Sequence, residues 1–122
     1  MNRARDKRIL IVEDEPILAI ALQDMLESLG YEVVGPAFRV APALALAADA
    51  AIDGAILDVN IGEGDSYGIA RRLDDRGIPY LFATGYGRDG LDPGHEAAFV
   101  LQKPYREKEI EAALGRLLAE GP

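Results

Sequence analysis

The chain has 122 residues, of which 49% are hydrophobic and 28% charged, a balance typical of a single globular domain rather than a disordered segment. Cysteine is absent, which excludes disulfides and thiolate metal sites, and no apolar run reaches the roughly 20 residues needed to cross a bilayer, so we expect a cytoplasmic protein without membrane contact. The formal net charge of −8 argues against nucleic acid as a partner, because phosphate backbones are neutralised by Lys and Arg.

The first half of the chain alternates short apolar runs with helical periodicity. The unbroken aliphatic run 9–12 predicts a strand covered on both faces, as in a parallel sheet. Pro16 suits the first turn of the next helix and Gly30 its end. Large apolar side chains recur in it at helical spacing, at Leu18, Leu22, Met25 and Leu29. A short strand at 33–34 and an Ala/Leu-rich helix over 42–51 follow.

The second half continues the alternation. Residues 55–57 predict a strand closed by Asp58, and a polar, glycine-rich loop over 60–65 leads to a helix that ends at Gly77. That helix and the last one carry apolar residues at helical spacing: Ile69, Ala70 and Leu73, then Ile110, Ala113, Leu114 and Leu117. Residues 80–83 and 99–101 predict two more strands, joined by a glycine-rich segment of low helix propensity. Strands alternating with helices predict one α/β domain over 1–122 with a parallel sheet.

Polar residues follow four of the predicted strands at the point where each ends. Glu13 and Asp14 follow the first strand, Asp58 closes the third, Thr84 closes the fourth and Lys103 follows the fifth. In open parallel sheets, ligands bind outside the carboxyl ends of the strands. Any one of these residues alone would be a loop or helix-cap residue, but their shared position at one edge predicts a site.

The chemistry of this set favours phosphoryl transfer. Three carboxylates close together repel unless a cation lies among them, and oxygen ligands without His or Cys indicate Mg²⁺. A carboxylate beside Mg²⁺ can act as the nucleophile that forms an aspartyl phosphate. The Lys103 ammonium and the Thr84 hydroxyl could stabilise the charge on the transferred oxygens.

These residues make the chain similar to the receiver domain of bacterial response regulators over nearly its whole length. The resemblance implies a flavodoxin-like, doubly wound sheet of five parallel strands in the order 2-1-3-4-5, flanked by helices on both faces, without an output domain. It also implies a role for each matching residue. Glu13 and Asp14 would be the acidic metal-binding pair, with Asp14 the direct ligand, and Asn60 would bind the metal through its backbone carbonyl. Asp58 would be the phosphoacceptor, Thr84 and Gly85 the hydroxyl position and its small neighbour, and Lys103 the lysine that precedes a cis Pro104.

The function implied by the resemblance is two-component signal transduction. Asp58 would accept a phosphoryl group, with Mg²⁺, from a histidine kinase or a histidine phosphotransfer protein, and the regulator would catalyse only its own phosphorylation and dephosphorylation. The string 79–86 resembles a subgroup with an FATGY motif, often stand-alone and fed by HWE-type or related kinases. The downstream partner would be another protein.

One position departs from the family pattern. Val100 stands where most receivers carry an aromatic residue that turns inward, and Phe99 cannot replace it because neighbouring strand residues face opposite sides of the sheet. We therefore expect the signal to pass through a phosphorylation-induced change in the region from the fourth to the fifth strand. Tyr86, two residues past Thr84, is a candidate either for shielding the phosphoryl site or for plain surface packing.

Other interpretations are weaker. The segment 85–90 satisfies the dinucleotide fingerprint but follows the fourth strand instead of the first, and His95, the only histidine, suits a surface position. A phosphohydrolase of the haloacid dehalogenase type would carry its nucleophile after the first strand, and a second Asp, the general acid, two residues past that nucleophile. In this chain the residue two past Asp58 is Asn60, whose amide cannot relay protons. A receiver-like interaction module that is never phosphorylated would be expected to lack part of the acidic set.

Overall fold

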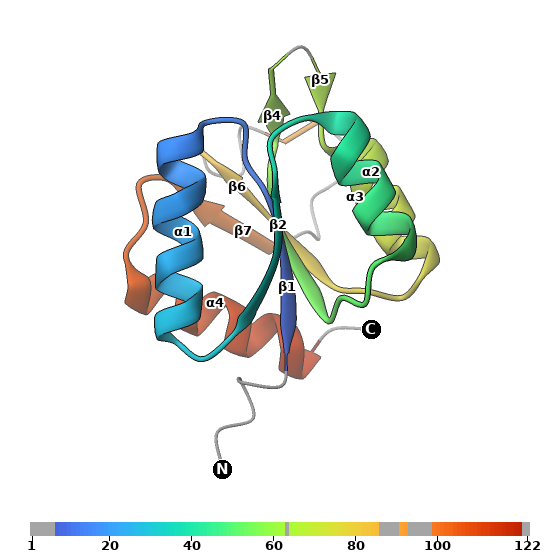
Figure 1. Ribbon diagram of the computed structural model, residues 1–122. Helices are drawn as coiled ribbons and strands as arrows, with labels where there is room; N and C mark the ends of the chain where they lie inside the picture. The colour runs from blue at the N-terminus through green and yellow to red at the C-terminus, as the bar shows by residue number, and fades with distance from the viewer. Residues whose placement is uncertain (1–6, 63, 86–90, 93–98, 121–122) are drawn as a thin grey trace.

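The computed structural model describes residues 7–62, 64–85, 91–92 and 99–120, and within them five parallel strands form one sheet (Figure 1). The strands are β1 (Arg8–Val12), β2 (Glu32–Ala37), β3 (Gly54–Asp58), β6 (Tyr80–Thr84) and β7 (Phe99–Gln102). Their order is β2-β1-β3-β6-β7, and every neighbouring pair is parallel. This order is equivalent to 2-1-3-4-5 and confirms the predicted doubly wound α/β sheet.

Helices cover both faces of the sheet (Figure 1). The helices α1 (Pro16–Ser28) and α4 (Glu107–Glu120) lie on one face, and α2 (Val40–Asp49) and α3 (Tyr67–Asp75) lie on the other. Successive residues of β1 alternate between two buried clusters: Ile9 and Ile11 pack with α1 and α4, whereas Leu10 packs with α2 and α3. Within the described residues, no helix is both long and apolar enough to cross a bilayer.

The buried side of α1 differs from the row of residues that stands at helical spacing in the sequence. Ala19, Leu22 and Leu26 are buried, whereas Leu18 is 41% exposed and Met25 and Leu29 are half-buried. The reason is the rotation of the helix, which keeps Leu22 against the sheet but turns Leu18 and Met25 toward the connection between β7 and α4.

The segment that follows Asp58 is more regular than the predicted loop. Its strands β4 (Asn60–Ile61) and β5 (Gly64–Asp65) pair antiparallel and form a hairpin. The hairpin stands at the carboxyl end of the sheet, and its first loop residue, Gly62, has a φ of +55°. Ile61 is buried, but the other residues of the two strands are polar or small, and two-residue strands are too short to show an alternating pattern in the sequence.

Candidate functional site

The carboxyl edge of the sheet gathers the polar residues that follow the strands. Glu13 and Asp14 follow β1, and Asp58 ends β3, the strand beside it. One carboxylate oxygen from each of these three side chains lies within 4.8 Å of the others. Lys103, after β7, reaches the same cluster with its ammonium group. The structure therefore brings together four of the residues that the sequence places at strand ends.

Lys103 is shared unequally between two of the carboxylates. Its Nζ atom lies 2.7 Å from Oε1 of Glu13 and 3.3 Å from Oδ1 of Asp58. The Glu13 side chain is 3% exposed, so this ion pair is shielded from solvent. Burial alone would lower the pKa of Lys103, but the bond to Glu13 and the charges of both carboxylates outweigh it and raise that pKa. Lys103 is therefore a fixed cation at this edge.

Asp58 carries a strongly perturbed carboxyl group. Burial, and next the negative charge of Glu13, raise the pKa of Asp58 to about 7, although Lys103 opposes the shift. Without another cation, protonated and ionised forms of Asp58 coexist near neutral pH. A divalent cation among the three carboxylates would favour the ionised form, which is the nucleophilic one.

The oxygen donors at this edge match the ligands that Mg²⁺ prefers. Carboxylates of Glu13, Asp14 and Asp58 supply oxygen only, and neither His nor Cys stands among them. Oδ2 of Asp14 accepts a 2.8 Å hydrogen bond from the amide of Gly62 in the hairpin, a contact that sequence reasoning missed. Asn60, two residues past Asp58, is exposed at the start of β4. Such a donor set fits a hard cation that keeps part of its water shell.

Thr84 closes the site on the side of β6. It is 3% exposed, and its carbonyl accepts a 2.9 Å hydrogen bond from the amide of Lys103. This bond fixes the end of β6 against the residue that carries the ammonium. Gly85 follows as an exposed turn residue, and the peptide bond between Lys103 and Pro104 is cis.

Several predicted features lie outside the described residues. They are Tyr86 and its proposed shielding role, His95, the glycine pattern beyond Gly85, and the weak helix between the fourth and fifth predicted strands.

Phe99 lies in the cluster under α1 and α4. The guanidinium carbon of Arg116, on α4, is 5.7 Å from the centroid of its ring. This placement agrees with the expectation that Phe99 does not stand in for the aromatic residue absent at Val100. On the opposite face of the sheet, Phe82 is buried, and the rings of Tyr67 and Tyr80 pack edge-on against it at centroid distances of 5.4 and 5.5 Å.

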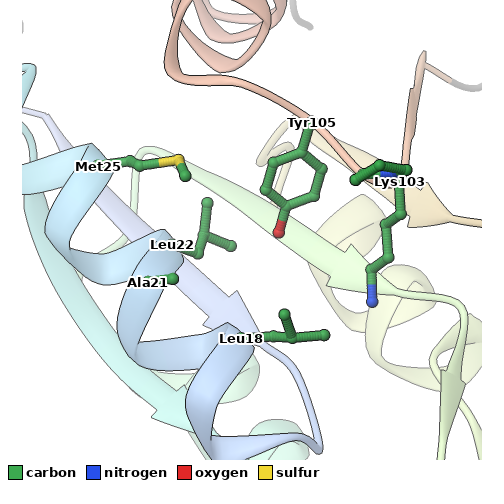
Figure 2. A pocket seen from close by; sticks show the side chains of 7 residues that line it. Leu18, Ala21, Leu22, Met25, Lys103 and Tyr105 are labelled. Carbon is green, nitrogen blue, oxygen red and sulfur yellow. The ribbon is translucent and has the colours of Figure 1, made fainter.

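An apolar pocket of about 350 Å³ opens beside Lys103, between α1 and the connection from β7 to α4 (Figure 2). Leu18, Leu22 and Met25 line it from the helix, and Tyr105 lies opposite with its hydroxyl pointing toward α1. Burial is the main cause that raises the pKa of Tyr105 to about 12, so this hydroxyl stays protonated. The pocket thus joins the acidic edge to the exposed side of α1.

Comparison with known families and curated proteins gives one consistent result. The family model described as the response regulator receiver domain matches residues 9–115. The phyllosphere-induced regulator PhyR of Methylorubrum extorquens is 32% identical over 114 residues, which cover 90% of this chain and 43% of PhyR. The transcriptional regulatory protein PdtaR of Mycobacterium tuberculosis is 30% identical over 117 residues, 93% of this chain and 57% of that protein. The chain thus spans about half the length of the curated relatives it matches.

Solved structures agree with this match. The solution structure of SdrG from Sphingomonas melonis Fr1 is 46% identical with a TM-score of 0.81, and the alignment covers 92% of this chain and 96% of SdrG. The receiver domain of the sensor histidine kinase PA1611 from Pseudomonas aeruginosa PAO1 shares the fold at 24% identity and a TM-score of 0.77, covering 93% of this chain and 98% of that one. That domain was solved with a magnesium ion coordinated in its active site cleft.

Proposed function

This chain belongs to the response regulator receiver domain family, and on that premise we propose that it accepts a phosphoryl group on Asp58 and signals through the phosphorylated state. The observation that carries the proposal is the clustering of Glu13, Asp14 and Asp58 within 4.8 Å of one another, with Lys103 bonded across them. A carboxylate, an acidic pair and a fixed cation are the groups that a phosphoryl transfer to a side chain requires.

The phosphoryl donor in this proposal is a protein phosphohistidine, carried by a histidine kinase or a histidine phosphotransfer protein. An Asp58 carboxylate oxygen attacks phosphorus, the P–N bond to the imidazole breaks, and the imidazole leaves with a proton from solvent. The product is an acyl phosphate. Lys103 lies 3.3 Å from Oδ1 of Asp58, where its ammonium can neutralise charge on a phosphoryl oxygen, and the buried Thr84 stands at the end of the neighbouring strand.

Mg²⁺ is the cofactor that this donor set fits. Asp14 and Asp58 would hold it directly together with the backbone carbonyl of Asn60, and Glu13 would act through water. When bound, the ion would neutralise the acidic cluster and stabilise the negative charge that develops on the phosphoryl oxygens. The engagement of Glu13 with Lys103 supports this division of roles, since an ammonium already occupies one of its oxygens.

We place the docking site of the phosphohistidine protein over α1 and the apolar pocket. A protein donor must approach Asp58 closely, and Lys103, which binds Asp58, also lines that pocket. Leu18 is 41% exposed and lines that pocket together with Met25, so apolar side chains are exposed there. Exposed apolar patches of this kind mark protein contact sites. HWE-type kinases, which the FATGY motif suggests, are one class of candidate donor.

We place the signalling change between β6 and β7. Thr84 begins that connection and Lys103 follows β7, so both groups that would bind the phosphoryl oxygens flank it. Amide hydrogen exchange with and without a beryllofluoride mimic of the phosphoryl group tests this placement. Altered exchange between residues 86 and 96 is expected, and identical exchange in both states would move the search to the exposed side of α4.

The experiment that tests the function is incubation with acetyl phosphate and Mg²⁺, followed by intact mass and peptide mapping. The wild-type chain should gain one phosphoryl group on Asp58, and only with the metal present. Asp58→Asn should gain none, because an amide does not form an acyl phosphate. Asp75→Asn, at the exposed end of α3, is the matched control and should be labelled like wild type. A phosphoryl group on the Asp58→Asn variant would overturn the assignment.

A further inference from the structure

Gly62 makes a contact that the proposed function does not by itself explain. Its amide donates a 2.8 Å hydrogen bond to Oδ2 of Asp14, which lies 48 positions earlier in the chain. The bond joins the β4–β5 hairpin to the acidic end of β1, two elements that share no strand pairing. Asp14 is the residue proposed as a direct ligand of the metal.

The geometry of the hairpin makes this amide available. Ile61 pairs with Gly64, so Gly62 is the first residue of a two-residue loop, and its φ of +55° is the positive value that such loops require. Amides of the loop residues are not used by the antiparallel ladder, so the one at Gly62 is free to point at another acceptor. A Cβ at Gly62 would meet nothing within 4 Å, so glycine is favoured here by the backbone conformation and not by lack of space.

We propose that Gly62 is a positioning residue for the metal site, acting through its backbone amide on Asp14. A carboxylate that accepts a bond on Oδ2 has a restricted rotation and offers Oδ1 as its remaining ligand. One oxygen per carboxylate suits Mg²⁺, which requires regular octahedral geometry, better than Ca²⁺, which accepts bidentate carboxylates. Bonds to metal ligands from outside the coordination sphere typically change metal affinity by 10–100-fold.

This inference rests on the proposed metal-dependent function, and its test is Mg²⁺ binding measured by calorimetry on the unphosphorylated protein. Gly62→Val places a β-branched residue at a positive φ and should displace the amide. We expect Mg²⁺ affinity to fall by about tenfold. Gly62→Asn keeps the amide and tolerates a positive φ, so it should retain affinity within about twofold of wild type.

A matched control separates positioning from general strain. Gly77 also has a positive φ, +71°, and a Cβ at this position would likewise meet nothing within 4 Å. It follows α3, outside the acidic cluster. Gly77→Val should lower the unfolding free energy about as much as Gly62→Val while leaving Mg²⁺ affinity unchanged. Equal Mg²⁺ affinity in folded Gly62→Val and wild type would overturn the inference alone. Absence of Mg²⁺ binding by the wild-type chain would instead overturn the proposed function.

Discussion

Lys103 lies closer to Glu13 than to Asp58: its Nζ atom is 2.7 Å from the Glu13 carboxylate and 3.3 Å from the Asp58 carboxylate. Glu13 is buried, so it holds the ammonium in a poorly hydrated environment where charge pairs interact strongly. A phosphoryl group on Asp58 would bring additional negative charge to the same ammonium. Glu13 therefore competes with the proposed phosphoryl group for Lys103, and its removal should have a measurable effect on Asp58.

Glu13→Gln should lower the pKa of Asp58. The substitution removes the negative charge that, after burial, contributes most to raising that pKa, and it leaves Asp58 as the charged partner of Lys103. A pH titration of the Asp58 carboxyl carbon by NMR, without metal, measures the change. Glu15→Gln, at an exposed neighbouring position, is the control and should leave the titration in place. An unchanged or higher pKa in Glu13→Gln would contradict the electrostatic account.

Asp58→Asn should stabilise the metal-free protein at pH 8. The pKa of Asp58 is about 7 in the folded state and near 3.8 when the group is unperturbed, so the folded state binds the proton more tightly. The ionised carboxylate therefore lowers the free energy of unfolding above pH 7, and this loss diminishes as the pH falls from 7 to about 4. Urea unfolding in EDTA across this range measures it. A stability gain that is the same at pH 8 and pH 4 would show that the charge is not its cause.

Asp14→Ala should weaken Mg²⁺ binding more than Glu13→Ala does. Asp14 offers an oxygen that no described ion pair occupies, whereas one oxygen of Glu13 is held by Lys103. Calorimetric titration of both variants with MgCl₂ at pH 8 compares them while Asp58 is mostly ionised. Equal affinities would contradict the ranking of the two ligands without removing the site.

Met25→Glu should slow phosphorylation by a phosphohistidine protein and leave phosphorylation by acetyl phosphate unchanged. The substitution puts a charge into the apolar pocket that we assign to the protein donor, while a small donor needs only Asp58 and the metal. The transfer rate from a phosphorylated HWE-type kinase, compared with the rate from acetyl phosphate, is the measurement. Ile20→Glu, on the same helix but outside the pocket lining, is the control. Parallel losses with both donors would argue against a docking role.

Much of the fold and the residues at its carboxyl edge could be predicted from the sequence. The runs at 9–12 and 55–57 are apolar because both faces of these strands are covered, and the polar residues after them mark where each strand ends. Local patterns suffice for such features. They also suffice to place Asp58 beside Glu13 and Asp14, since parallel neighbours end at the same edge.

The contacts within the site could not be predicted in the same way. Which carboxylate Lys103 approaches more closely depends on side-chain geometry across several strands. The Gly62–Asp14 bond depends on the hairpin, whose two-residue strands have no hydrophobic pattern. The exposure of Leu18 and the burial of Leu26 depend on how α1 is rotated over the sheet, and helical spacing alone allows more than one rotation.

The ion pair between Lys103 and Glu13 also bears on synthesis of the chain. The two residues are 90 positions apart, and they follow β1 and β7, strands that pair only with parallel neighbours. A nascent chain emerging from the ribosome carries Glu13, Asp14 and Asp58 long before Lys103 is translated. During that interval the acidic residues lack their cation, and β6 lacks the neighbour that completes the sheet. On the proposed function, the site is therefore complete only after β7 has been released, so unfinished chains should not accept a phosphoryl group from the donor.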